Sequence, residues 1–313
     1  MKNKKIYYWS SNNSIKSGEG VLANNFLYDL EKKLKIKCIK IKKNTFFDKV
    51  NKDSFIYKYF LPYCGVLKLW LLYFKNYKLC YLNYLPLWNF LIFFTLPPKT
   101  ILGPITGTIN KKRNFFLKKL FESLSIFIIK QRFKKCLFSN NFYYKFFPKH
   151  FHNYIIRKLE FKKISKKKYD FDFIFYYRKN YDQNCYQKKM ISYLLSKNYK
   201  IALIGDKLKI KNILNFGYIG NNKLNKILCK TKCAVSNPEN LYSFFVQDCL
   251  SNNLIVFYNN EFKKFEKFQI KNFYPIPYDN INNAYQLIVK NMTKPIKKNK
   301  NINLQFENFF KNV

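Results

Sequence analysis

The sequence predicts an α/β protein made of two Rossmann-like domains that face each other across a cleft. Strand-like and helix-like runs alternate along most of the 313 residues, which is typical of parallel sheets covered by helices. The alternation restarts after the lysine-rich run 162–168, so each half has about 150 residues, the size of one compact domain. Seven of the eight glycines lie at expected strand ends or in strand-to-helix loops, and Gly65 is the exception.

In the N-terminal half, the first expected strand is 6–10, and the helix expected over 21–34 has an apolar stripe at helical spacing. The stripe consists of Leu22, Phe26, Leu27, Leu30 and Leu34. The other expected elements are a strand over 35–41, a helix over 66–74, a strand over 79–84, a helix over 88–95, a strand over 100–102, the loop 103–107, a helix over 115–129 and a strand over 135–139.

The second half repeats the alternation after a connector over 148–169, which we expect to be exposed. Strands are expected over 171–177, 199–205, 213–218, 233–236 and 254–258, and helices over 183–196, 222–229, 242–250 and 281–289. We therefore expect an N-terminal domain over 1–160 and a C-terminal domain over 161–295. The segment 296–313 contains an expected helix, 304–310, which could pack back on the N-terminal domain.

The formal net charge of +42 predicts an attraction to anions. Only four of the 59 basic residues are arginine, the side chain that readers of DNA and RNA use for bidentate contacts. Lysine, asparagine, isoleucine, phenylalanine and tyrosine dominate, and all have AT-rich codons, so compositional bias explains the charge better than a nucleic-acid role. Nucleotide diphosphates, lipid-linked diphosphates and an anionic membrane surface remain candidate partners.

Membrane and metal signals are weak. The longest apolar stretch, 85–97, is shorter than the roughly 20 residues that a membrane-spanning helix needs. No apolar h-region with a small-residue cleavage site follows the charged first residues, so we do not expect export. The eight cysteines are scattered and neither histidine lies near a pair of them, so we expect free thiols and no metal site. These features favour a cytoplasmic protein, which could also be peripheral on the cytoplasmic face of the membrane.

Two glycine-containing loops could approach a ligand. The loop 17–20 has the sequence SGEG and precedes the first expected helix, and the loop 103–107 has the sequence GPITG. Glycine lets the backbone come close to a ligand, and a following helix offers unpaired N–H groups to phosphate oxygens. The alternative is that these glycines only make turns.

The segment 199–258 carries a recognisable pattern. It contains a strand that ends in Gly205 and Asp206, the element NFGYIG at 215–220, a strand that ends at Ser236, and then two positions, 240 and 248, separated by seven residues. This pattern resembles the donor-binding domain of GT-B glycosyltransferases, especially the retaining "glycosyl transferases group 1" superfamily. The resemblance covers most of 169–260 and extends only loosely over the first half.

The resemblance implies a GT-B fold and a glycosyltransferase of the hexosyltransferase type. Such an enzyme moves a sugar from a nucleoside-diphosphate donor to an acceptor hydroxyl with retention of configuration, here in surface glycan or lipopolysaccharide assembly. It also implies that no metal and no cofactor are needed beyond the donor as co-substrate. The acceptor, a glycan or a lipid-linked molecule, would bind the N-terminal domain.

The same resemblance assigns roles to residues near position 240. Asp248 matches the carboxylate that binds the ribose hydroxyls, shortened from the usual glutamate. The carboxylate that touches the transferred sugar is replaced by Asn240, so either Asn240 or the adjacent Glu239 would make this contact. The backbone N–H groups of Tyr242 and Ser243 suit a diphosphate or a sugar oxygen.

Further donor contacts are implied after the first strand of the C-terminal domain. Arg178 matches the arginine that neutralises the diphosphate. The expected lysine five positions later is Gln183, so Lys179 or Lys188 would replace it, and Gly217 belongs to the glycine element near the donor. From the N-terminal domain, the resemblance suggests Gly18, Glu19, Gly20, Gly103, Thr106 and Gly107 as donor-side backbone groups and Asn83 as a sugar contact.

Two other classes of function remain open at this point. A basic nucleic-acid-binding protein would use the positive charge, and a catalytically silent GT-B-like protein would bind a nucleotide or a glycan without turnover. Apolar and basic helices around 67–78 and 88–94 could rest on a membrane, although an ordinary core is the simpler explanation of their aromatic residues.

Overall fold

The computed structural model describes residues 5–10, 18–42, 55–106, 116–138, 152–154, 161–162, 168–179, 184–237, 241–266 and 270–299. The chain divides into unit 1, which is Met1–Ile155 with Gln305–Val313, and unit 2, which is Ile156–Leu304. Each unit contains a six-stranded sheet in which every pair of neighbouring strands is parallel. The prediction of two parallel α/β domains is therefore confirmed.

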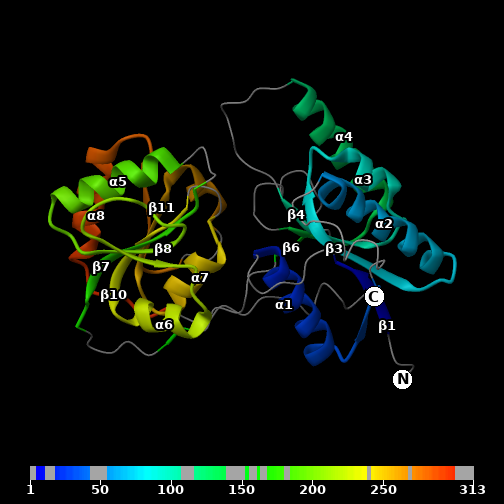
Figure 1. Ribbon diagram of the computed structural model, residues 1–313, viewed down its shortest axis with the longest axis horizontal. Coiled ribbons are helices and arrows are strands. Elements are labelled where there is room, and N and C mark those ends of the chain that lie inside the picture. The colour runs from blue at the N-terminus through cyan, green and yellow to red at the C-terminus, as the bar shows by residue number, and fades with distance from the viewer. Residues whose placement is uncertain are drawn as a thin grey trace. The chain divides into compact units, whose positions relative to one another are not determined.

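Unit 1 has the strand order β2-β1-β3-β4-β5-β6, with α1 on one face of the sheet and α2, α3 and α4 on the other (Figure 1). Its elements are β1 (Lys5–Trp9), α1 (Gly18–Lys33), β2 (Lys37–Lys40), α2 (Phe55–Tyr73), β3 (Lys78–Pro86), α3 (Phe90–Thr95), β4 (Ile101–Thr106), α4 (Phe116–Arg132), β5 (Cys136–Phe138) and β6 (His152–Tyr154).

Alternation along the strands explains this layering, because successive side chains of a strand point to opposite faces. Ile6 and Tyr8 of β1 pack in the core beneath α1, whereas Trp9 packs in the core beneath α2. Gly65 of α2 lies against the Trp9 ring, since a Cβ at position 65 would be 2.3 Å from Trp9 Nε1. The close approach of α2 to β1 therefore explains the glycine at position 65, the one that is not at an expected strand end or in a strand-to-helix loop.

Unit 1 differs from the sequence expectation at three places. Helix α2 begins at Phe55 and is 19 residues long, although it contains Pro62. Residues 103–106, expected in a loop, continue strand β4, and β6 lies inside the stretch expected to be a connector. Short strands with few apolar residues, such as HNY in β6, are stabilised by pairing with a neighbour rather than by their own pattern.

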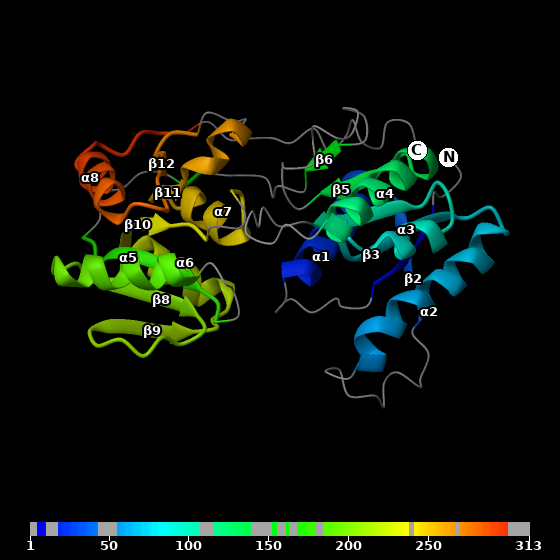
Figure 2. The same cartoon turned by 90° about the horizontal axis from the view of Figure 1, so that it is seen from above.

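Unit 2 has the strand order β12-β11-β10-β7-β8-β9 (Figure 2). Its elements are β7 (Phe171–Tyr177), α5 (Asn184–Ser196), β8 (Ile201–Gly205), β9 (Ile213–Gly217), α6 (Asn221–Cys229), β10 (Thr231–Val235), α7 (Phe244–Ser251), β11 (Ile255–Asn259), the 3₁₀ helix η4 (Asn260–Phe265), β12 (Phe273–Ile276) and α8 (Ile281–Met292). All five residues of β8 and of β11 are buried, as expected for strands covered on both faces.

Helices α5 and α8 pack on one face of the unit 2 sheet, and α6 and α7 lie together on the other (Figure 1). The sequence reading missed β12 and η4. Strand β12 contains Pro275, which lacks a backbone donor, and pairs only with β11 at the edge of the sheet, the position where proline is tolerated. The helix expected over 304–310 lies outside the described residues.

The end of the connector is fixed to unit 2 by polar contacts. The backbone N–H of Lys162 donates to the carbonyl oxygen of Ser251 (3.0 Å), and its Nζ donates to Asn252 Oδ1 (2.7 Å). Asn253 Nδ2 donates in turn to the carbonyl oxygen of Lys162 (2.7 Å). Lys162 is exposed, as expected for the connector, and these contacts fix its position on unit 2, whereas 163–167 lie outside the described residues.

Candidate functional site

The strand order of unit 2 marks one position along the carboxyl ends of its strands. From β7 the chain adds strands in one direction to β9, and from β10 it adds them in the other direction to β12. In open parallel sheets, ligands bind at the carboxyl ends of the strands beside such a reversal, where the following loops diverge. Here the reversal lies between β7 and β10, whose last residues are followed by Arg178 and Ser236.

Arg178 is held at this position by an aromatic stack. Its Nε donates to Tyr176 Oη (2.8 Å), and its guanidinium carbon lies 5.2 Å from the centre of the Tyr176 ring. The Tyr176 ring also contacts Phe245 in the first turn of α7, with ring centres 5.9 Å apart and an interplanar angle of 30°. Since α7 is the helix that follows β10, the stack connects both sides of the reversal.

Helix α7 has a well-defined start. Ser243 is its N-cap, and the Ser243 hydroxyl accepts from the backbone N–H of Val246 (3.3 Å). The buried Gln247 donates through Nε2 to the carbonyl oxygen of Tyr242 (2.9 Å), which fixes the turn before the helix. The backbone N–H groups of a first helical turn have no acceptor within the helix, so this start favours an anionic ligand.

Asp248 is partly buried and lies three residues after Phe245, which places it one turn further along α7. Its carbonyl oxygen accepts from Asn252 Nδ2 (2.8 Å), and this bond closes the end of the helix. Arg178 and Asp248 therefore belong to two elements that the Tyr176–Phe245 contact joins. The Tyr242 side chain is buried against Phe273, with ring centres 6.0 Å apart, so the side chain packs in unit 2.

Asp206, the residue after β8, fixes the backbone on both sides of Arg178. The backbone N–H of Asp206 donates to the carbonyl oxygen of Tyr177 (2.9 Å), and Asp206 Oδ2 accepts from the backbone N–H of Lys179 (2.7 Å). Tyr218, after β9, donates through its hydroxyl to Asp206 Oδ1 (2.9 Å). The Lys179 N–H, the Tyr218 hydroxyl and the charges of Arg178 and Lys179 lower the pKa of Asp206.

Gly205 makes this arrangement possible. It has φ +92°, and a Cβ there would be 2.2 Å from the carbonyl oxygen of Tyr177. Only glycine allows β8 to end so close to β7, with Asp206 directly beside the turn at 177–179.

A second polar cluster lies at the other side of the reversal. Tyr278, after β12, donates its hydroxyl to the carbonyl oxygen of Ser236 (2.6 Å). Its ring stacks on Tyr186 in the first turns of α5, with centres 4.1 Å apart and an interplanar angle of 12°. Burial raises the pKa of the Tyr278 hydroxyl, so it stays a neutral donor. The ends of β10 and β12 and the start of α5 are thereby held together.

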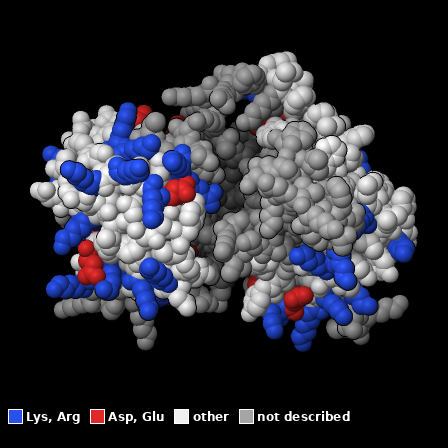
Figure 3. Space-filling view, viewed as in Figure 1, with Lys and Arg blue, Asp and Glu red and all other residues white. Residues whose placement is uncertain are grey.

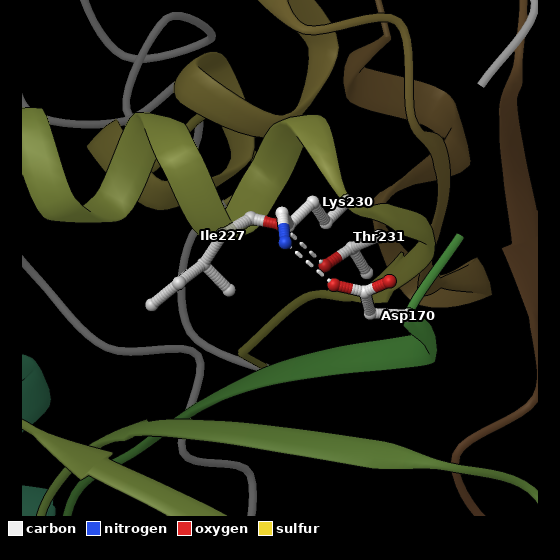
Figure 4. Close-up of polar contacts among 4 residues, drawn as sticks. All are labelled: Asp170, Ile227, Lys230 and Thr231. Carbon is white, nitrogen blue, oxygen red and sulfur yellow. Dashed lines mark hydrogen bonds and ion pairs between the residues drawn. The ribbon is translucent and has the colours of Figure 1, made fainter. Parts of the chain in front are cut away.

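The opposite edge of the same sheet, at the amino ends of β7 and β10, has polar contacts of an ordinary structural kind (Figure 4). Lys230 Nζ pairs with Asp170 Oδ2 (2.8 Å), and both side chains are largely exposed. The Thr231 hydroxyl donates to the carbonyl oxygen of Ile227 (2.8 Å) and so fixes the end of α6. Exposed pairs of this type contribute little to stability and provide matched controls for the residues at the carboxyl edge.

The remaining predicted residues of unit 2 fall into three groups. Gly217 ends β9 with φ +69°, and a Cβ there would meet no atom within 4 Å, so space is open beside it. Lys179 and Lys188 are exposed, the first beside Arg178 and the second on α5. Glu239 and Asn240 lie outside the described residues, so their roles stay predictions.

In unit 1, Gly18, Glu19 and Gly20 form the first turn of α1 rather than a loop before it. Gly103 lies within β4, and a Cβ there would be 2.3 Å from Leu137 Cβ, so close packing against β5 accounts for this glycine. Thr106 ends β4, and Gly107 lies outside the described residues. Asn83 is buried in β3, where its Nδ2 donates to Tyr81 Oη (3.1 Å), whose hydroxyl donates to the carbonyl oxygen of Pro62 (3.3 Å).

Asp206 and Tyr176 belong to this arrangement but were not among the predicted site residues. Asp206 had a signal, since it is a carboxylate directly after a strand at the edge where ligands bind. For Tyr176 the only sequence signal was its position two residues before Arg178, because residues i and i+2 of a strand lie on the same face of the sheet. Its contact with Phe245 joins residues 69 positions apart and could not be read from local sequence.

The chain matches no family model, and no curated protein matches it in sequence. Sucrose-phosphate synthase from Thermosynechococcus elongatus has a similar structure, with a TM-score of 0.61 and 8% identity over 92% of this chain and 90% of that chain.

Two further solved structures are similar. WaaG, described as a glycosyltransferase involved in lipopolysaccharide biosynthesis, gives a TM-score of 0.55 with 9% identity over 92% of this chain and 90% of its own. A glycosyltransferase from Rickettsia africae gives a TM-score of 0.52 with 12% identity over 94% and 89%. At such low identity the likeness shows the fold, and the chain has the GT-B fold.

Proposed function

We propose that this chain is a glycosyltransferase that moves a sugar from a nucleoside-diphosphate donor to an acceptor hydroxyl, with retention of anomeric configuration, in the assembly of a surface glycan or lipopolysaccharide. Unit 2 binds the donor, and unit 1 binds the acceptor. The domain boundaries of this proposal are 1–160 and 161–295, with 296–313 as an additional segment. The donor is the only co-substrate, and the protein acts in the cytoplasm.

The observation that carries the proposal is the fixed position of Arg178 at the reversal between β7 and β10. Its hydrogen bond to Tyr176 and its stacking leave the guanidinium little freedom, so little conformational entropy is lost when it meets an anion. A nucleoside diphosphate gains negative charge as the bond to the sugar breaks, and a fixed cation stabilises that charge. In this proposal Arg178, together with Lys179 or Lys188, neutralises the diphosphate charge that a metal ion neutralises in other transferases.

Asp248 and the start of α7 supply the second half of the donor site in this proposal. The Asp248 carboxylate accepts from the two ribose hydroxyls, and the first-turn N–H groups of α7 donate to phosphate or sugar oxygens. Glu239 or Asn240, which precede this turn, contacts the transferred sugar.

The distribution of positive charge supports this proposal over a nucleic-acid-binding function. On the face shown in Figure 3, the described lysine and arginine side chains are spread over the surface, with uncharged surface between them. A nucleic-acid-binding surface concentrates such side chains along one stripe that follows the phosphate backbone. The observed spread agrees better with a composition rich in lysine.

The test is thermal unfolding of the full chain with UDP, GDP, ADP, CMP and duplex DNA. We expect one nucleoside diphosphate to raise Tm saturably, since a ligand that binds only the folded state stabilises it. Radiolabelled donor and an acceptor extract then separate an active transferase from a silent binder, and NMR of the product gives the anomeric configuration. Stabilisation by DNA but by no nucleotide would overturn the proposal.

Asp206 gives a further prediction about this site. Asp206→Ala should weaken binding of the preferred nucleoside diphosphate about 5- to 20-fold, because the turn that carries Arg178 loses its hydrogen bond to a charged acceptor. The measurement is isothermal titration calorimetry. Asp172→Ala is the matched control, since its carboxylate also accepts a backbone N–H, that of Lys200 (2.8 Å), but at the opposite edge of the sheet.

A pH series of protein stability tests whether the ionised Asp206 carboxylate stabilises the folded state. The lowered pKa of Asp206 means that its ionised form stabilises the folded state. This stabilisation is fully present above the ordinary carboxyl pKa of about 3.9 and is lost as the pH falls through the lower pKa of the folded state. The difference in urea midpoint between wild type and Asp206→Asn should be constant from pH 5 to 7 and shrink below about pH 4. A difference that varied between pH 5 and 7 would exclude this cause.

A further inference from the structure

Three helices of unit 1 present large apolar side chains to solvent. They form what we call the apolar face: Phe60, Leu67, Leu71 and Phe74 along α2 and its end, Trp88, Leu91 and Phe94 along α3 and the turn before it, and Phe116, Leu117, Leu120, Leu124 and Phe127 along α4. All are exposed, from 38% at Leu124 to 78% at Phe116. Such a number of exposed large apolar residues on adjacent elements is unusual for a monomer surface and marks an interaction site.

The apolar face is not a set of core residues that failed to pack. The inner sides of the same helices are already buried against the sheet, through Leu61, Val66 and Leu69 of α2, Ile92 and Phe93 of α3, and Ile128 and Ile129 of α4. The outer residues recur at helical spacing of their own, at 67, 71 and 74 on α2 and at 117, 120, 124 and 127 on α4. Each helix is therefore apolar on two sides, and only one side faces the sheet.

The three helices form one continuous surface. The rings of Phe90 and Phe121 join α3 to α4, with centres 5.0 Å apart. Arg132 of α4 also donates to the carbonyl oxygen of Leu96 after α3 (2.8 Å). Trp70 Nε1 of α2 donates to the carbonyl oxygen of Thr95 in α3 (2.7 Å). Figure 1 shows the three helices side by side on one face of the unit 1 sheet.

The charged residues of these helices and their ends are almost all basic. The segments 55–75, 88–99 and 116–135 contain ten basic residues and one acidic residue, Glu122. In Figure 3 the surface over α3 and α4 is mainly uncharged, with basic side chains at the margin of the unit. Exposed apolar residues together with lysines are the combination by which a protein binds the interface of an anionic membrane.

We infer that the apolar face of α2, α3 and α4 docks unit 1 on an anionic lipid bilayer. The phenylalanine, leucine and tryptophan side chains enter the headgroup region, and the lysines bind the negatively charged leaflet. Among the described residues, no helix is long and apolar enough to cross a membrane, so the helices lie along its surface. A second copy of the chain is a poorer occupant, because its apolar face would bring another ten basic residues against these ten. The inference does not depend on the proposed function.

The test is flotation of the full chain with lipid vesicles in the absence of nucleotide. Wild type should float with vesicles that contain phosphatidylglycerol, and binding should weaken at high salt as the charges are screened. The variant Leu71→Ser, Leu91→Ser, Phe127→Ser removes one exposed residue from each helix. Its partition coefficient should fall about 100-fold, because three apolar side chains no longer enter the interface.

The matched control is Leu214→Ser, Leu287→Ser, Val289→Ser, which removes three exposed apolar residues of unit 2. It should float like wild type, and both triple variants should keep the wild-type Tm because surface substitutions change stability little. Three results would overturn the inference. They are wild type that does not float, a unit 1 variant that floats as well as wild type, and light scattering that shows a dimer which the unit 1 variant abolishes.

Discussion

Arg178→Ala should lower the catalytic rate of sugar transfer about 100-fold or more, while the Tm of the free protein changes little. Removing one fixed group that stabilises developing negative charge typically costs two to three orders of magnitude in rate, because the interaction strengthens as the transition state forms. Arg178 is partly exposed after the carboxyl end of β7, and its Nε donates to the Tyr176 hydroxyl rather than to a core residue. Initial rates with saturating donor and acceptor give kcat directly.

Two further variants separate charge from position. Arg178→Lys keeps the charge but loses the hydrogen bond to Tyr176 and the planar stacking, so we expect its rate to lie between those of wild type and alanine. Lys197→Ala removes an exposed cation at the end of α5 that contacts the Tyr193 ring, and it should act like wild type. If Arg178→Ala and Lys197→Ala had equal rates, Arg178 would not belong to the donor site.

Asp248→Ala should abolish the rise in Tm that the preferred nucleoside diphosphate produces. A carboxylate that accepts from two ribose hydroxyls makes two charge-assisted hydrogen bonds, and losing both raises Kd by about 100-fold or more. At nucleotide concentrations near the wild-type Kd, the variant is then almost unliganded. The measurement is thermal unfolding over a nucleotide titration.

Asp170→Asn is the control for this variant, because Asp170 is also a carboxylate of unit 2 but pairs with Lys230 at the opposite edge of the sheet (Figure 4). It should keep the full nucleotide response. Asp248→Asn tests the charge, since the amide keeps the shape and one acceptor oxygen. A wild-type response in Asp248→Ala would remove this residue from the proposed donor site.

The sequence was sufficient for the fold class, and the roles of the candidate site residues stay predictions. Strand β8, with the residues IALIG, is apolar throughout because both faces of a parallel strand are covered, and this pattern is visible without coordinates. Arg178 and Asp206 could be placed at the binding edge because each directly follows a strand. Local signals of this kind depend only on neighbouring residues.

The tertiary structure decided features that depend on residues far apart in the chain. Strands β6 and β12 form because a neighbour pairs with them, and GPIT at 103–106 is strand because β4 packs against β5 at Gly103. The stack of Arg178, Tyr176 and Phe245 and the contact of Asp206 with Lys179 both join separate elements. The aromatic residues of α2 and α3 fit a core equally well in the sequence, and only the packed helices show which side of each is left exposed. Composition and spacing fix which residues can be buried, whereas the partners of each helix determine which ones are.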